Sequence, residues 1–259
     1  LMQVLLKKYQ LWPEFNPPLK STAVDDLMTC LILGIIIGGR IGYVCFYQPH
    51  YYLTNPIDIL KVWNGGMSFH GGFLGVVLGT ILYARKHQIN LLSLGDLIAV
   101  ASPPGLLFGR IANFINGELW GKPTKFAWGM VFPDKNAQLC PESWWGECTR
   151  HPSQLYEAAS EGLFLWLIMM VFVFYFGSFK RRGETICIFL IGYGVSRAVI
   201  ENFREPDAQF ISELNPNGYI IFLSETFGLS MGQILCAPMI VIGLAYIIVR
   251  KSKILKFDK

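Results

Sequence analysis

Apolar residues gather in six runs along the chain, each close to the roughly 20 residues that a membrane-spanning helix needs. The runs cover residues 24–47, 66–84, 97–115, 155–177, 185–203 and 231–249, and polar or basic connections separate them. This pattern predicts an all-α polytopic membrane protein. We expect a bundle of six visible spans that forms a single transmembrane domain over residues 1–259.

The composition supports a membrane protein. Hydrophobic residues make up 53% of the chain and charged residues only 15%, whereas a soluble domain carries about 25% charged residues. The net charge of +4 could suggest a nucleic-acid partner. However, the basic residues form short clusters beside the apolar runs, which is the pattern of a membrane protein. We therefore expect no nucleic-acid partner.

Lysine and arginine are distributed unevenly between the two alternating sets of connections. One set carries Lys7, Lys8, Lys20, Arg85, Lys86, Lys180, Arg181, Arg182, Arg250, Lys251, Lys253, Lys256 and Lys259. The other set carries only Lys61, Lys122, Lys125, Lys135, Arg150 and Arg204. Because basic connections stay in the cytoplasm, we expect both chain ends inside and residues 116–153 outside, as a small external head. The first residues are apolar and then basic, the reverse of a signal peptide, so we expect a further helix before them.

The cysteines follow the same topology. Four of them lie in apolar runs, where cysteine is usually a small core residue: Cys30, Cys45, Cys187 and Cys236. Cys140 and Cys148 share the external segment, where an oxidising compartment would permit a disulfide.

The first run contains small residues at close spacing, namely Gly34, Gly38, Gly39 and Gly42. In a membrane such spacing lets helix backbones approach closely. Arg40 lies among these glycines. We favour snorkelling of Arg40 towards the outer interface over a contact with substrate.

The third run combines a helix breaker with intramembrane polar residues. Pro103 and Pro104 are adjacent, and they predict a break in the helix. The run then ends in GRIANFINGELWG, residues 109–121. An arginine at the centre of a span costs roughly 2.5–3.5 kcal/mol, so Arg110 predicts a functional role. Arg110 and Asn113 share one helix face, and the helix is expected to unwind near residues 116–117.

Two other segments place polar groups where helices begin. Residues 63–75, WNGGMSFHGGFLG, bring His70 into the membrane near its outer face. Histidine gains or loses a proton near neutral pH, so it can take part in proton transfer. HPSQLYEA, residues 151–158, opens the fourth run. We interpret Glu157 there as an acid that complements the helix dipole.

The fifth run carries four polar residues on one face of an otherwise apolar helix. They are Tyr193, Arg197, Glu201 and Arg204. One carboxylate cannot neutralise two arginines, so we expect this face to bind an anion. The arginine fork suits phosphate, and arginines near the outer leaflet predict a phospholipid headgroup as the ligand.

Four blocks in this order resemble the prolipoprotein diacylglyceryl transferase family. They are residues 63–75, 109–121, 151–158 and IGYGVSRAVIENFREPDAQF at 191–210. The resemblance implies an enzyme of the bacterial inner membrane with its active site towards the periplasm. It would move the diacylglyceryl group of phosphatidylglycerol onto the lipobox cysteine of a prolipoprotein, forming a thioether and releasing glycerol phosphate. It implies no metal and no soluble cofactor.

The resemblance also implies roles for individual residues. Those expected to be catalytic are His70, Arg110, Arg197 and Glu201. Those expected to bind substrate are Tyr193, Asn113, Asn116, Glu118, Gly121 and Asp96, together with Arg204. Either His70 or Glu201 would accept the thiol proton, and we favour His70. The family has seven spans, one more than the six runs found here.

A phospholipid or anion transporter is the alternative function. A transporter can also place arginines and a broken helix near the membrane midplane. Transporters usually show two similar halves, however, and the two arginine segments share no recognisable repeat.

Overall fold

The computed structural model describes residues 1–141, 144–206, 210–212, 215, 217–224 and 228–257; the side chains of Asn64, Phe69, His70 and 251–257 lie outside this description. The chain divides into two compact units, and each is described by itself. The first contains residues 1–98 and 179–183, and the second contains residues 99–178 and 184–259. The expectation of a single transmembrane domain stays a prediction.

The first unit is helical. Its elements are α1 (Met2–Lys7), η1 (Tyr9–Leu11), η2 (Pro13–Phe15), η3 (Ser21–Ala23), α2 (Val24–Phe46), α3 (Pro49–Thr54), η4 (Pro56–Leu60), η5 (Val62–Asn64), α4 (Phe69–Lys86) and the first turns of α5 (Leu91–Ile115). Residues 179–183 join this unit after η8 (Ser178–Lys180) begins. There Phe179 stacks on Trp12 with ring centroids 4.2 Å apart, and the indole of Trp12 donates to the carbonyl oxygen of Leu5.

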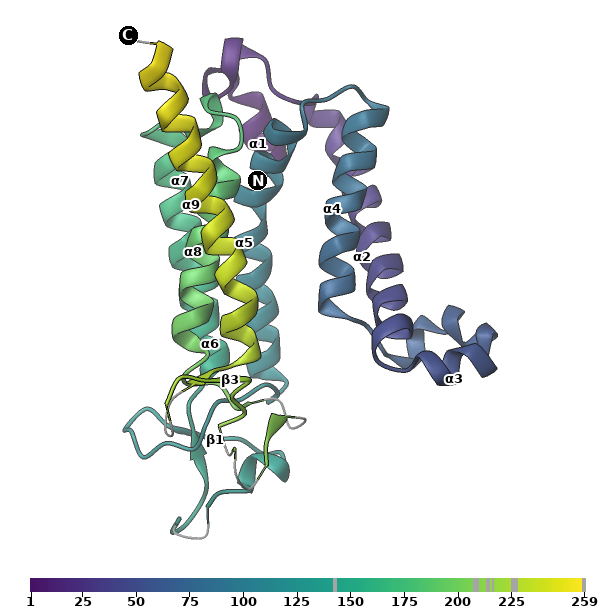
Figure 1. The fold of residues 1–259 in the computed structure, drawn as a ribbon, viewed down its shortest axis with the longest axis vertical. Coiled ribbons are helices and arrows are strands. Elements are labelled where there is room, and N and C mark those ends of the chain that lie inside the picture. The colour runs from purple at the N-terminus through teal and green to yellow at the C-terminus, as the bar shows by residue number, and fades with distance from the viewer. Residues whose placement is uncertain (142–143, 207–209, 213–214, 216, 225–227, 258–259) are drawn as a thin grey trace. The chain divides into compact units, whose positions relative to one another are not determined.

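Glycines form the interface between α2 and α4, which lie side by side (Figure 1). A Cβ atom at Gly71 would lie 2.2 Å from the carbonyl oxygen of Gly38, and one at Gly75 would lie 1.9 Å from that of Gly34. No side chain fits at these positions, so the two backbones are in direct contact. The close helix packing predicted from the glycines of the first run is confirmed.

Gly71→Ala is expected to lower the free energy of unfolding by about 1–3 kcal/mol, because the added methyl group forces the two helices apart. Thermal unfolding in detergent measures the effect. Gly72→Ala is the matched control, since a Cβ atom there meets its nearest neighbours at an ordinary 3.7 Å. Equal stability of the two variants would contradict direct contact between the helices.

Arg40 is buried against the loop that precedes α4, with 4% of its surface exposed. Its guanidinium donates to the carbonyl oxygens of Asp58 (2.5 Å), Ile59 (2.8 Å) and Gly65 (2.6 Å). The prediction that Arg40 snorkels to the interface is therefore wrong. The carbonyl groups of the loop replace water as its partners, and Arg40 fixes the loop conformation instead.

The second unit is a helical bundle with a small polar head. Its helices are the rest of α5, α6 (Ser153–Glu157), η7 (Ala158–Phe164), α7 (Leu165–Phe174), α8 (Glu184–Ile200) and α9 (Met231–Phe257). The segment η7 is a π-helix that joins α6 and α7 into one continuous rod, and α8 lies beside α9 (Figure 1).

Helices occupy all six ranges predicted to span. Among the described residues, four helical segments are long and apolar enough to cross a membrane: 21–46, 91–115, 153–174 and 231–250. The protein is thus a helical membrane protein. Crossings by α4 and by the 17-residue α8 stay predictions.

The helix α5 runs through both prolines without interruption, so the predicted break is wrong. Proline's fixed φ is compatible with a helix, and the cost is the loss of two backbone hydrogen bonds to the preceding turn. Transmembrane helices tolerate this loss because neighbouring groups satisfy the freed carbonyls.

The head between α5 and α6 is held by short-range pairing and by one buried arginine. The strand β1 (Met130–Val131) pairs with β2 (Thr149–Arg150), and η6 (Asn136–Gln138) lies between them in the chain. Arg150 donates to the carbonyl oxygens of Ala137 and Leu139. Cys140 and Cys148 are joined by a disulfide, as the sequence permitted. A second hairpin, of β3 (Ile221–Phe222) and β4 (Gly228–Leu229), precedes α9.

Candidate functional site

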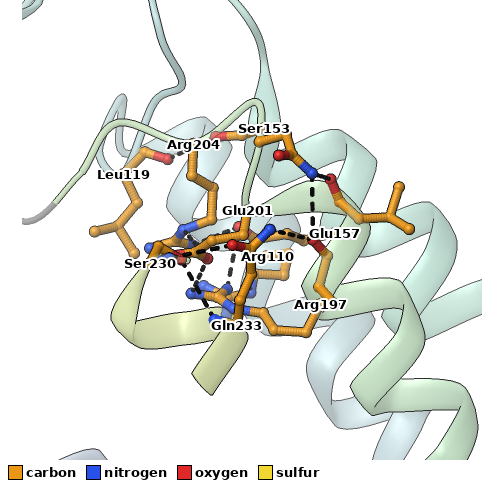
Figure 2. Close-up of polar contacts among 12 residues, drawn as sticks. Arg110, Leu119, Ser153, Glu157, Arg197, Glu201, Arg204, Ser230 and Gln233 are labelled. Carbon is orange, nitrogen blue, oxygen red and sulfur yellow. Dashed lines mark hydrogen bonds and ion pairs between the residues drawn. The ribbon is translucent and has the colours of Figure 1, made fainter. Parts of the chain in front are cut away.

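Three arginines converge on the carboxylate of Glu157, at the end of the second unit where the helices meet the head (Figure 2). The Nε atom of Arg110 lies 2.6 Å from Oε2 of Glu157. Nη1 of Arg204 donates to Oε1 of the same carboxylate, and Nη1 of Arg197 lies 3.5 Å from it. Glu157 has only 1% of its side chain exposed. It is the common partner of charges from α5, from α8 and from the segment that follows α8.

Glu201 forms the second carboxylate of this arginine cluster, which we define as Arg110, Arg197 and Arg204. Its Oε2 lies 3.1 Å from Nη2 of Arg197 and 3.6 Å from Nε of Arg204. The hydroxyl of Ser230, at the start of α9, donates to its Oε1 over 3.2 Å. A Cβ atom at Gly232 would lie 2.5 Å from the Glu201 carboxyl carbon, so this glycine makes room for the carboxylate.

The start of α9 is shaped by a capping box. The backbone N–H of Gln233 donates to the hydroxyl of Ser230, and the side chain of Gln233 accepts from the backbone N–H of Ser230. The Gln233 amide also donates to the carbonyl oxygen of Ala198 in α8. These bonds hold the Ser230 hydroxyl where it can reach Glu201.

The π-helix brings a third acidic residue to this end of the bundle. Glu161 is fully buried in η7, one turn after Glu157. A Cβ atom at Gly162 would lie 2.7 Å from Cβ of Leu107, so η7 packs tightly against the helix that carries Arg110. Single turns of π-helix are frequent at functional sites.

The interpretation of Glu157 as a dipole-complementing acid is wrong, because the side chain points into the bundle and pairs with arginines. The excess of positive charge is also smaller than predicted, because two carboxylates rather than one are paired with the arginines. Glu161 was not singled out from the sequence. The available signal was the spacing of Glu157 and Glu161, four residues apart and hence on one face of an apolar helix.

The last turn of α5 and the residues that follow it form a polar rim. The side-chain amides of Asn113 and Asn116 donate to Oε1 of Glu118 over 2.8 and 3.2 Å. These bonds, that of Asn113 foremost, lower the pKa of the Glu118 carboxyl below its usual value. The helix ends at Ile115, and Gly117 takes a φ of +67°. The predicted unwinding of the helix at this point is confirmed.

Backbone contacts tie this rim to its neighbours. The carbonyl oxygen of Glu118 accepts from the Gln154 amide over 2.5 Å, and the N–H of Gly121 donates to the carbonyl oxygen of His151 over 2.9 Å. A Cβ atom at Gly121 would lie 2.4 Å from the carbonyl oxygen of Phe203. Gly121 therefore contributes close packing rather than a side-chain contact.

Three predicted site residues are not part of the ion pairs of the arginine cluster or are not described in full. Tyr193 lies one turn before Arg197 on α8 and stacks on Phe189. Asp96 belongs to the first unit, where it is fully buried and accepts from the backbone N–H of Gly183 over 2.6 Å. His70 is in the first turn of α4, and its side chain lies outside the described residues. The roles predicted for these three residues stay predictions.

An apolar cavity of about 500 Å³ lies between the head and the helix ends of the second unit. Its walls are Phe126, Trp128, His151, Tyr156, Ile200 and Phe203. His151 contacts the hydroxyl of Tyr156 at 3.1 Å, and burial lowers the pKa of His151 below its usual value. Burial thus favours the neutral form of this histidine, and the cavity can accommodate an apolar group.

The chemistry of the cluster favours a phosphate ligand. Each guanidinium has five N–H donors, and the carboxylates engage only some of them. Buried arginines hold phosphate through parallel charge-assisted bonds. Within the part of the chain that the structure describes, no three His, Cys, Asp or Glu side chains are grouped to hold a metal ion.

Comparison with known proteins identifies the family of this chain. Residues 1–249 match the family model described as "Prolipoprotein diacylglyceryl transferase". A relative from Ruegeria pomeroyi is 52% identical over 93% of this chain and 81% of its own length. A relative from Cereibacter sphaeroides is 49% identical over 96% of this chain and 84% of its own length. A relative from Nitratidesulfovibrio vulgaris is 49% identical over 85% of this chain and 75% of its own length. All three are named phosphatidylglycerol–prolipoprotein diacylglyceryl transferase. The chain therefore belongs to the prolipoprotein diacylglyceryl transferase family.

Proposed function

We propose that this protein is a membrane-embedded transferase that moves the diacylglyceryl group of phosphatidylglycerol onto the lipobox cysteine thiol of a prolipoprotein. The observation that carries the proposal is the convergence of Arg110, Arg197 and Arg204 on one buried carboxylate. This cluster offers a phosphate group several guanidinium donors in a water-poor setting. The family membership favours a transferase over the alternative of a lipid or anion transporter.

The reaction breaks a carbon–oxygen bond and forms a carbon–sulfur bond. The thiolate attacks the carbon of the diacylglyceryl group that is bonded to the phosphate oxygen. Glycerol phosphate then leaves with the bonding electrons. Negative charge grows on the phosphate in the transition state, and Arg110 and Arg197 would stabilise it. The aqueous thiol has a pKa near 8.5, so a proton acceptor is useful at neutral pH.

Glu201 and His70 are the two candidates for the proton acceptor. Glu201 is ion-paired with Arg197 and Arg204 and accepts from Ser230. Three side chains thus hold the carboxylate in place. We therefore assign this role to His70, on the basis of the family resemblance, and a positioning role to Glu201.

We place the active site on the periplasmic side of the bacterial inner membrane. The disulfide between Cys140 and Cys148 supports an oxidising compartment around the head. The unequal distribution of basic residues supports the same orientation, with six spans and both described ends in the cytoplasm. The substrates would be phosphatidylglycerol, drawn from the surrounding membrane lipid, and the lipobox segment of the prolipoprotein.

The test is to incubate the purified protein with phosphatidylglycerol and a lipobox peptide, and to follow the peptide by mass spectrometry. We expect a peptide enlarged by one diacylglyceryl group, and equimolar glycerol phosphate. The control peptide carries serine in place of cysteine and should stay unmodified. Movement of lipid across vesicles without any thioether product would overturn the proposal.

A further inference from the structure

Glu161 is a buried acid that the reaction described above does not use. Its side chain is fully inaccessible, and neither carboxyl oxygen has a hydrogen-bond partner among the residues that the structure describes. A buried ionised carboxylate without hydrogen bonds is costly. Gly162 packs closely against Leu107, so η7 lies directly beside α5. The Glu161 carboxyl group is thus buried beside the helix that carries Arg110.

The groups that face Glu161 come from every neighbouring element. Glu157 precedes it on the same rod, Arg110 acts on it from α5, and Arg197 and Arg204 act on it from α8 and the segment beyond. Tyr193 on α8 and Cys236 on α9 also lie within electrostatic range of Glu161. Both are uncharged at neutral pH, so the arginines and Glu157 dominate its surroundings.

The net charge of the arginine cluster and its carboxylates depends on whether Glu161 is ionised and whether a ligand is bound. Three arginines face Glu157 and Glu201, which are both ion-paired. This leaves one positive charge, and an ionised Glu161 would cancel it. A phosphodiester brings one further negative charge into the same space. With Glu161 ionised the complex would carry an uncompensated negative charge, whereas with Glu161 protonated it would be neutral.

We propose that Glu161 exchanges a proton to match the charge of the arginine cluster to its ligand: above neutral pH it is ionised when the cluster is empty, and it takes up a proton when a phosphodiester binds. Glu161 is then a positioning residue that acts through the arginines. The inference rests on the proposed function, because it takes the phosphodiester to be that of phosphatidylglycerol.

The experiment is calorimetric titration of the full-length chain, in detergent, with phosphatidylglycerol in mixed micelles. Titrations in buffers of different ionisation enthalpy give the number of protons taken up. For the wild-type protein we expect a value that rises from near zero at about pH 5 towards about one proton per bound lipid at higher pH. Glu161→Gln should bind the lipid with no proton uptake at any pH. Glu161→Asp keeps a carboxyl group and should restore the uptake.

The controls separate this inference from the proposed function. Diacylglycerol has the same acyl chains without the phosphate, and it should cause no proton uptake. Equal uptake by wild type and Glu161→Gln, or no uptake by wild type at any pH, would overturn the role of Glu161 while leaving lipid binding and transfer intact. Absence of phosphatidylglycerol binding to the wild type would overturn both proposals. If Glu161→Gln does not fold, Glu161→Asp decides instead: aspartate is the stronger acid, so its uptake should begin at a lower pH, and an unshifted pH profile would overturn the role of Glu161.

Discussion

Arg110→Lys is expected to reduce diacylglyceryl transfer by about 100-fold or more while the protein still inserts and folds. Arg110 uses Nε to contact Glu157, and its two terminal nitrogens remain on the same planar fork. A guanidinium can therefore contact a carboxylate and a phosphate together, with parallel bonds to the phosphate. Lysine keeps the charge but has a single nitrogen, so it cannot bind both in that geometry.

The measurement is kcat for thioether formation, with thermal unfolding in detergent as the check on folding. Arg85→Lys is the matched control, because it makes the same replacement at an exposed position in the last turn of α4. That variant should turn over like the wild type. Near-normal turnover in Arg110→Lys would show that the planar guanidinium of Arg110 is not needed to stabilise the leaving phosphate.

The class of protein and the location of the arginines could be predicted from the sequence because both depend on local patterns. Apolar runs of spanning length predict helices without any knowledge of tertiary contacts. Arg110 and Arg197 are conspicuous because an arginine within such a run is costly. The end of α5 shortly before Gly117 also follows from local chemistry, since glycine readily adopts a positive φ.

The partners of the arginines could not be predicted in the same way, because they depend on tertiary contacts. Glu157 at the start of a helix has an adequate local explanation, and only the packing of α5, α8 and η7 shows that it faces three arginines. The π-helix that buries Glu161 has no local signature in the sequence. Arg40 illustrates the same limit, since the loop that surrounds it begins 18 residues later in the chain.

Glu157→Gln is expected to lower the free energy of unfolding by about 3–5 kcal/mol, because it leaves buried arginine charges without their main partner. Among the described residues, Glu201 would then be the one carboxylate still ion-paired with Arg197 and Arg204, and Arg110 would lose its only ion pair. Thermal unfolding in detergent measures the loss. Glu147→Gln makes the same change at an exposed position of the head and should stay within about 0.5 kcal/mol of the wild type.

Phosphatidylglycerol should restore stability to Glu157→Gln more than it adds to the wild type. Without the Glu157 carboxylate the arginine cluster is more positive, so a phosphodiester that binds among the three guanidiniums takes over part of the missing charge compensation. Ligand binding raises the unfolding midpoint, and at equal concentration the rise is larger for a ligand that binds the folded state more tightly. The midpoint of the variant should therefore rise further than that of the wild type with added phosphatidylglycerol, and neither should rise with diacylglycerol. An equal rise in both proteins would mean that the lipid phosphate binds away from Glu157 and its arginines.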